Sequence, residues 1–147
     1  MAELSSETIQ GACVAIAGRG VLIEARDDTQ RTDLLLRLLD RGATLVSDAR
    51  TACTRRGEAL SAAAPAGTGG RVEIRGIGPV EMESLAEVDV ALIAVVLDAA
   101  PRLPEDRRFR NIAGIAVPVL ALGPGEPAAP IKVEYALKAL APKAPAK

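Results

Sequence analysis

The sequence contains no histidine and no tryptophan, and Phe109 and Tyr135 are its only aromatic residues. Without an imidazole, the chain offers no histidine base, no phosphohistidine relay and few kinds of zinc site. With so few rings it has no platform on which nucleic-acid bases or an adenine could stack. The core must therefore be aliphatic, built from Ala, Leu, Val and Ile.

An excess of charge of one sign is also lacking. The 147 residues carry 18 Lys and Arg against 19 Asp and Glu, a net charge of −1, with no long block of one sign. A general nucleic-acid surface is therefore not expected. The two cysteines, Cys13 and Cys53, form no C-x-x-C pair, and we expect both to be small buried residues in a reducing compartment.

Long apolar runs are missing as well. No run reaches the roughly 18 residues of a membrane span, and MAELSSETIQ has none of the regions of a signal peptide. We expect a cytoplasmic protein with no membrane partner. The length suits one domain over residues 1–147, with residues 1–8 and 142–147 as flexible tails.

The first half of the chain predicts a strand, loop, helix, strand unit. Apolar runs at 12–17 and 20–24 indicate a tight hairpin around Gly18. Leucines at 34, 35, 38 and 39 follow at helical spacing, and the helix should close at residues 40–42 before a strand at 43–47.

The second half predicts further strands and one helix. Strands are expected at 51–54, 58–64, 71–78, 89–99 and 115–123, the fourth as a buried central strand. The polar stretch 101–114 is expected to form a surface loop or short helix, and the spacing of Val133, Ala136, Leu137 and Leu140 predicts a C-terminal amphipathic helix. The expected fold is a mixed α/β sheet with few helices.

The segment EARDDTQRT, residues 24–32, lies where a phosphate-binding loop would join the strand to the helix. Such a loop, G-x-x-x-x-G-K-[ST], wraps phosphates with glycine backbone and the free N–H groups of the next helix. Here its defining positions are Ala25, Gln30, Arg31 and Thr32, so only the hydroxyl is unchanged. Side chains replace both glycines, and Arg31 keeps the charge in a different geometry.

Two carboxylates in the same segment point to a filled anion site. Asp27 and Asp28 stand just before the helix, where they can accept the N–H groups that would bind phosphate. Residues 24–33 hold four acidic and two basic side chains, an unfavourable field for a polyanion. We expect an acidic helix cap without a ligand; the alternative is a nucleotide held by Arg31 and Thr32.

The residues around this segment resemble the catalytic domain of HPr kinase/phosphorylase, which phosphorylates and dephosphorylates a serine of the histidine-containing phosphocarrier protein of sugar transport systems. The likeness runs from Ile9 to about Leu140 and is nearest to short forms without an extra N-terminal domain. It rests on GRGVLI (18–23), TDLLLRLLDRGATLVSD (32–48), RVEIRGIG (71–78) and NIAGIAVPVLAL followed by APIKVEYAL. It implies a mixed-sheet phosphate-loop kinase fold of the HPr kinase and phosphoenolpyruvate carboxykinase type, in proteins that commonly form hexamers.

The resemblance also implies roles for single residues. Gln10 stands where the family has a histidine, and Arg31 and Thr32 where it has Lys-Ser. Asp48 matches the first of two adjacent aspartates and is the candidate general base, whereas Ala49 replaces the second. The family's Glu-x-Arg-Gly signature is intact as Glu73, Arg75 and Gly76. Magnesium, if bound, would be held by Thr32 and Glu73.

Each of these residues has an ordinary structural interpretation too. Asp48 could cap the next turn, and Glu73 and Arg75, which alternate on a predicted strand, could pair with each other. The arginines of the 101–114 segment, at positions 102, 107, 108 and 110, could face an acidic partner, another subunit or solvent.

Three functions follow as hypotheses. The first is a catalytically impaired HPr kinase/phosphorylase-like domain that acts as a regulatory protein-binding module in bacterial phosphotransferase-linked signalling, with no cofactor. The second is an active serine kinase/phosphorylase that uses ATP and magnesium. The third is a ring-forming assembly protein. The expected partners are an HPr-type phosphocarrier or another signalling protein, and further copies of the chain.

Overall fold

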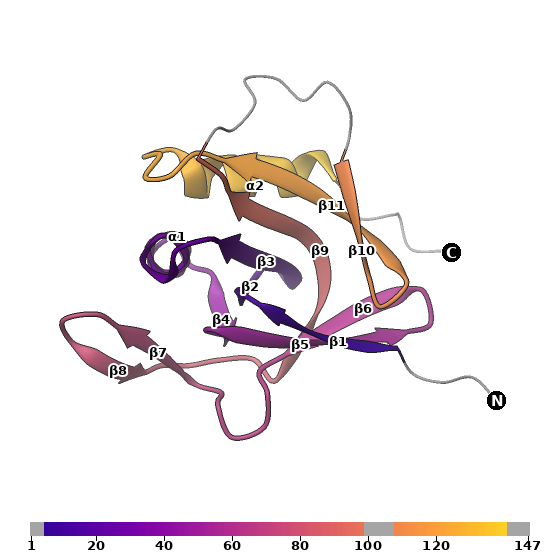
Figure 1. Ribbon diagram of the computed structural model, residues 1–147, viewed down its shortest axis with the longest axis horizontal. Coiled ribbons are helices and arrows are strands. Elements are labelled where there is room, and N and C mark those ends of the chain that lie inside the picture. The colour runs from indigo at the N-terminus through magenta and orange to yellow at the C-terminus, as the bar shows by residue number, and fades with distance from the viewer. Residues whose placement is uncertain (1–4, 99–107, 141–147) are drawn as a thin grey trace.

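The computed structural model describes residues 5–98 and 108–140, which form a curled mixed sheet, a separate hairpin and two helices (Figure 1). In chain order the elements are β1 (Ser6–Gln10), β2 (Ala12–Ile16), β3 (Arg19–Ala25), α1 (Asp28–Asp40), β4 (Thr44–Ser47), β5 (Arg50–Arg56), β6 (Ala59–Ala63), β7 (Arg71–Ile74), β8 (Gly78–Glu81), β9 (Glu87–Val96), β10 (Arg108–Ile112), β11 (Ile115–Leu122) and α2 (Ala129–Ala139). The mixed α/β fold expected from the sequence is confirmed.

Strand β9 is the centre of the sheet. The strands run in the order β1-β5-β6-β9-β3-β2-β4, and β11, with β10 beside it, also pairs with β9. Strand β9 is parallel to β3 and β11 and antiparallel to β6. Leu92, Ile93 and Ala94 in its middle are almost fully buried, as predicted for a central strand.

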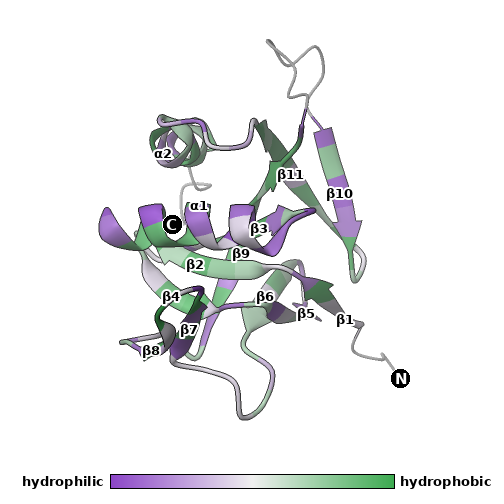
Figure 2. Ribbon diagram, turned by 60° about the vertical axis from the view of Figure 1, so that its left-hand side comes forward, coloured by the Kyte–Doolittle hydropathy of each residue, from purple (hydrophilic) through white to green (hydrophobic). Residues whose placement is uncertain are grey.

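Helix α1 covers one face of the sheet with its leucine stripe. Leu34, Leu35 and Leu38 are buried against a core cluster that includes Val14 and Val21 of β2 and β3. Figure 2 shows the hydrophobic inner strands and the polar outward face of α1. The helix ends at Asp40, as expected.

The cysteines belong to a second aliphatic cluster. Cys13 on β2 and Cys53 on β5 are both fully buried and unpaired, in agreement with the prediction. Burial away from water raises the pKa of the Cys53 thiol to about 11 and raises that of Cys13 further. Both thiols are therefore protonated at neutral pH and act as small apolar groups.

Two contacts fix the C-terminal helix. The Arg19 guanidinium, on β3, donates to the carbonyl oxygens of Leu137 and Leu140 at the C-terminal end of the helix. The Arg41 guanidinium donates two hydrogen bonds of 2.8 Å to the Glu134 carboxylate, joining the end of α1 to α2. Neither helix in the described ranges is long and apolar enough to cross a membrane.

Three predictions about the elements need correction. Residues 6–8, assigned to a flexible tail, form the first part of β1, because their backbone pairs with β5. The 101–114 segment contains strand β10, which pairs with β11 through its backbone despite its polar side chains. Residues 71–78 are not one strand but β7, a turn and the start of β8, since Gly76 has a φ of +89°. Residues 142–147, Arg102 and Arg107 lie outside the described residues.

Candidate functional site

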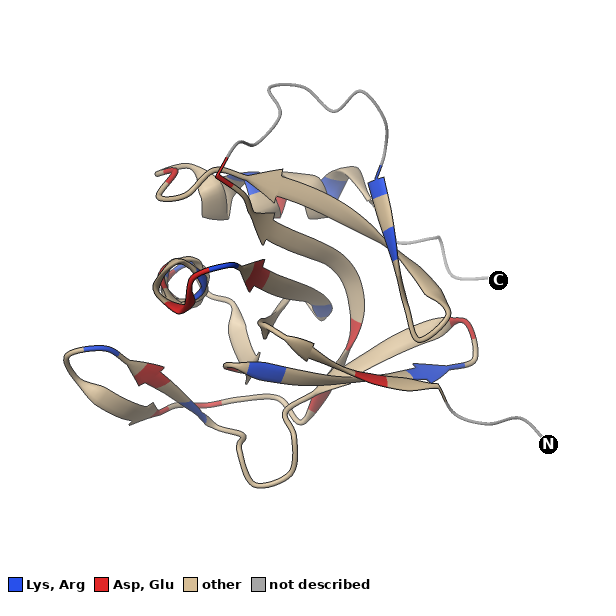
Figure 3. Ribbon diagram, in the orientation of Figure 1, with Lys and Arg blue, Asp and Glu red and all other residues tan. Residues whose placement is uncertain are grey.

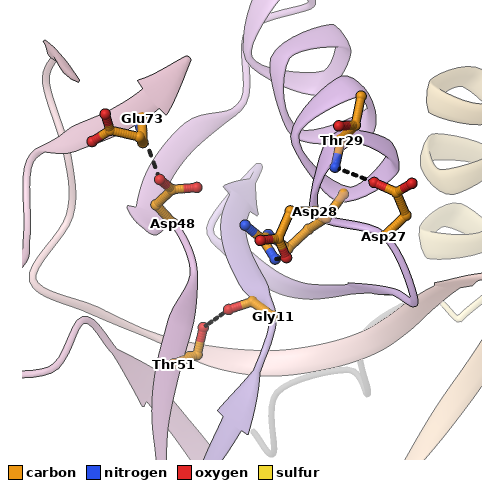
Figure 4. Close-up of polar contacts among 8 residues, drawn as sticks. Gly11, Asp27, Asp28, Thr29, Asp48, Thr51 and Glu73 are labelled. Carbon is orange, nitrogen blue, oxygen red and sulfur yellow. Dashed lines mark hydrogen bonds and ion pairs between the residues drawn. The ribbon is translucent and has the colours of Figure 1, made fainter. Parts of the chain in front are cut away.

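The junction between β3 and α1 is much shorter than the sequence suggested. Strand β3 continues to Ala25 and helix α1 begins at Asp28, which leaves only Arg26 and Asp27 between them. Asp27 is the N-cap, because its Oδ1 accepts a hydrogen bond of 2.6 Å from the Thr29 backbone N–H (Figure 4). The predicted carboxylate cap is therefore confirmed for Asp27.

The prediction of a loop over residues 24–32 is wrong. Gln30, Arg31 and Thr32 lie within the first turns of α1, and Ala25 is the last residue of β3. The cap at Asp27 explains the early start, since it satisfies a helix N–H and lets the backbone turn helical at once. Of the positions expected to wrap phosphate, residues 28–32 are helical instead.

Arg31 is buried and pairs with Asp28 on its own helix. Its Nη1 lies 2.7 Å from Asp28 Oδ1, and Arg31 is only 9% exposed although the Asp28 side chain is 85% exposed. Its Nε is buried without a hydrogen-bond partner. The cation at the loop-lysine position thus lies inside the protein with a carboxylate from the same turn.

A cleft of about 460 Å³ separates the start of α1 from the β7–β8 hairpin. From α1 it is lined by Asp28, Thr29, Arg31, Thr32, Asp33 and Leu36, and from β7 and its turn by Glu73, Ile74 and Arg75. The fold thus brings together Arg31, Thr32, Glu73 and Arg75, which are up to 44 positions apart in sequence. Side chains of both charge signs line it, and Figure 3 marks acidic and basic residues on α1 and on β7 and its turn.

Asp48 follows β4 and contacts the hairpin. Its Oδ2 accepts a hydrogen bond of 2.9 Å from the Glu73 backbone N–H, and its Oδ1 is buried with no partner (Figure 4). This hydrogen bond joins Asp48 to β7, 25 positions later in the sequence, and not to the next turn of the chain. The alternative in which Asp48 caps its own turn is not observed.

The intact signature is spread over a strand and a turn. Glu73 lies in β7, Arg75 lies beyond the end of β7, and Gly76 occupies the left-handed position of the turn. Among the described residues no ion pair joins Glu73 to Arg75. The expected pairing fails because the strand ends between the two residues.

Gln10 lies apart from these residues. It ends β1 and lines a different hollow of about 250 Å³, together with Glu24, Ala25 and Arg26 and with residues 95–98 of β9 and the following turn. Two ion pairs cross this region: Arg110 with Glu24 at 2.6 Å, and Arg26 with Asp98 at 3.3 Å. Arg110 of the predicted loop therefore pairs within the chain.

A third hollow, of about 270 Å³, shares Glu73 with the cleft beside α1. It is lined by Asp48, Ala49, Arg50, Pro65, Thr68, Arg71 and Glu73. Arg50, Thr68 and Arg71 were not predicted as site residues. The position of Arg50, two residues after Asp48 at the start of β5, was the one signal that could have indicated it.

The described ranges contain no group of three or more Cys, Asp or Glu side chains arranged to hold a metal ion. Thr32 and Glu73, the magnesium ligands implied by the resemblance, do line the same cleft, one on each wall. Asp48 borders the neighbouring hollow.

The fold is that of an HPr kinase-type α/β domain. A solved structure of the HPr(Ser) kinase/phosphatase from Coxiella burnetii superposes with a TM-score of 0.79 over 90% of this chain and 95% of that one, at 24% sequence identity. The model of the HPr serine kinase C-terminal domain family matches residues 2–129. The chain belongs to this family.

A curated relative agrees with this assignment. An HPr kinase/phosphorylase of Chloroherpeton thalassium is 28% identical over 125 residues, which is 76% of this chain. The matched part is 37% of that relative's length, so the chain spans well under half of it.

Proposed function

We propose that this chain is an HPr kinase/phosphorylase-like domain that has lost phosphoryl transfer and acts by binding another protein. The observation that carries the proposal is the 2.7 Å pair between Arg31 and Asp28. Phosphoryl transfer depends on positioned cations and backbone donors around the transferred group. Here the cation at the lysine position is already neutralised by a side chain from the same turn.

The residues at the loop position do not fit a nucleoside triphosphate with magnesium. Only two residues separate β3 from α1, so no stretch of backbone is left to surround the phosphates. Asp27 accepts from the Thr29 N–H, one of the helix donors that would meet the anion. Asp28 adds negative charge at the same end. We therefore assign ATP and magnesium no role in this domain.

The partner we propose is a protein of phosphotransferase-linked bacterial signalling, in the cytoplasm. The relatives are named for a kinase and phosphorylase of HPr, so an HPr-type phosphocarrier is the first partner to test. The cleft beside α1 is lined by the apolar side chains of Leu36 and Ile74 together with both signs of charge, which suits a protein segment better than a polyanion. Self-association is expected to accompany this role.

Thermal unfolding with ATP and magnesium tests the loss of nucleotide binding. A ligand that binds only the native state must raise the melting temperature. We expect the same melting temperature with ATP and magnesium as with magnesium alone. A rise of several degrees would contradict the proposal.

The active-enzyme alternative has one observation in its favour, since Arg31, Thr32 and Glu73 line one cleft. Labelled phosphate transfer from ATP to a purified phosphocarrier protein separates the two functions, and we expect none. Binding is measured in parallel by titrating the phosphocarrier onto the chain. The assembly alternative would be excluded by a monomer in light scattering at micromolar concentration.

A further inference from the structure

The β7–β8 hairpin is held to the protein by side-chain packing of β7 and not by pairing with a strand of the main sheet. It forms a two-stranded sheet of its own, apart from the nine-stranded sheet, and extends from the body beside α1 (Figure 1). Val72 near its base is fully buried in the main core, whereas Ile77 at its tip is 73% exposed. The base is therefore anchored by packing and the tip is free in this structure.

Asp48 bonds to the hairpin at Glu73, which lies between Val72 and Ile74, both packed in or against the main core. In the hairpin register Glu73 lies opposite Pro79, which has no backbone N–H, so this pair cannot exchange the two bonds of a hydrogen-bonded pair. The Glu73 N–H points outward and is donated to Asp48 Oδ2 at 2.9 Å. The bond is charge-assisted, and a carboxylate that accepts from an N–H is a stronger partner than a neutral acceptor.

The turn that carries Asp48 is itself firmly held. Ser47 and Thr51, on either side of it, are both buried, and their hydroxyl oxygens lie 2.5 Å apart. Thr51 Oγ1 donates to the Gly11 carbonyl oxygen at 2.9 Å, which ties the turn to the residue before β2 (Figure 4). Asp48 is therefore a fixed point from which the hairpin is held.

The hairpin also forms a wall of the cleft beside α1. Glu73, Ile74 and Arg75 line this cleft of about 460 Å³, and no hydrogen bond among the described residues joins them to α1. Two glycines with positive φ, Gly67 and Gly70, precede β7 and allow the backbone to turn there. The width of the cleft thus depends on how the hairpin is held from the Asp48 side.

We propose that Asp48 is a latch for the β7–β8 hairpin, and that breaking its bond to the Glu73 N–H releases the outer hairpin and widens the cleft. In this role Asp48 accepts a backbone hydrogen bond and is not a proton acceptor in catalysis. The inference does not rest on the proposed function, because it concerns the motion of the chain alone.

Hydrogen–deuterium exchange on the full chain tests the latch. In Asp48→Ala we expect the Glu73 amide to exchange about tenfold faster or more, since a hydrogen bond to a charged group is lost. Amides of β3 and β9 should keep their wild-type rates. Asp48→Asn, which keeps an oxygen acceptor, should change the Glu73 rate less. Asp89→Ala, which removes an exposed carboxylate of β9, is the matched control and should change nothing in the hairpin.

A fluorescent reporter makes the motion visible. The chain has no tryptophan, so Ile77→Trp places a single one at the hairpin tip. We expect lower tryptophan anisotropy when Asp48→Ala is added to this background. Glu73→Pro removes the backbone N–H donor and keeps the Asp48 carboxylate, so it should lower the anisotropy equally. The two changes together should lower it no further than either one alone.

The following results would contradict the role of Asp48 as a latch. An unchanged Glu73 amide in Asp48→Ala, or exchange that rises equally in β3 and β9, overturns the latch. Additive effects of Asp48→Ala and Glu73→Pro on the tip anisotropy overturn it too. If Asp48→Ala does not fold, Glu73→Pro alone carries the test, and an unchanged anisotropy in that variant is the contrary result.

Discussion

Arg31 Nη1 lies 2.7 Å from Asp28 Oδ1, three residues earlier on the same helix. In the phosphate-loop pattern that the sequence suggested, Arg31 takes the position of the lysine and Asp28 takes one of the variable positions. Their side chains contribute differently to the free energy of unfolding, because Arg31 is buried and Asp28 is exposed to solvent. Removing one partner should therefore not have the same effect as removing the other.

Asp28→Ala should destabilise the protein more than Arg31→Met does. Without Asp28 the buried guanidinium loses its partner, at a cost of about 1 kcal/mol in the free energy of unfolding, because solvent already screens the pair. Methionine at position 31 fills similar space and removes a buried Nε that has no partner, so the change should be near zero. Urea denaturation measures both, and a larger loss in Arg31→Met would show that the pair itself is stabilising.

Restoring the loop chemistry should restore some nucleotide affinity. The variant carries Ala25→Gly, Asp28→Gly, Gln30→Gly and Arg31→Lys together, which shortens α1 at its start and frees backbone N–H groups for phosphate. We expect ATP to bind this variant in calorimetric titration and not to bind the parent chain. If the folded variant binds no ATP, the site has changed beyond the loop.

The contact between Arg41 and Glu134 should make stability depend on pH in the acid range. Hydrogen bonds from the Arg41 guanidinium hold the pKa of the Glu134 carboxyl below its ordinary value of 4.5. A lowered pKa in the folded state stabilises the protein above the unfolded value, and this is lost as the pH falls through the folded pKa. Arg41 stays charged throughout this range.

We therefore expect Glu134→Gln to melt slightly below the wild type at pH 7, with the difference shrinking as the pH falls below 4.5. Melting temperatures measured at several pH values check this. A difference that stays constant down to the acid limit would assign the effect to packing. Asp89→Gln, which removes an exposed carboxylate without a recorded ion pair, controls for net charge.

Arg19 should hold the end of α2. Its guanidinium donates to the carbonyl oxygens of Leu137 and Leu140, so Arg19→Met should remove these two hydrogen bonds from the last turn of the helix. We expect a loss of about 1 to 2 kcal/mol in the free energy of unfolding. Amide exchange should rise in α2 and not in α1. Arg19→Lys, with a single ammonium group, should give an intermediate result; full protection of α2 in Arg19→Met would refute the cap.

The regular elements were predictable where side chains alternate or repeat. The leucine spacing of α1, the apolar run of β9 and the pattern of α2 each depend on local periodicity, so the sequence alone located them. Strands β1 and β10 were missed because their side chains are mostly exposed and polar. Their strand form comes from backbone pairing with β5 and β11, which no local pattern records.

The candidate site was predicted in its residues but not in its arrangement. The sequence identified Arg31, Thr32 and Glu73, and the fold brings them to one cleft. It did not place Gln10 in a separate hollow, nor could it show that Asp48 bonds to the Glu73 backbone, because these relations join strands far apart in the chain.

By itself, then, the sequence determined the aliphatic core, the absence of histidine chemistry and the acidic cap at Asp27, since composition and near-neighbour hydrogen bonds set these. Tertiary structure alone decided how early α1 begins, that Arg31 is buried beside Asp28, and that Asp48 contacts the β7–β8 hairpin. The physical reason is that burial and long-range backbone pairing depend on which segments meet in space. The identity of a single residue does not determine which distant segments it will contact.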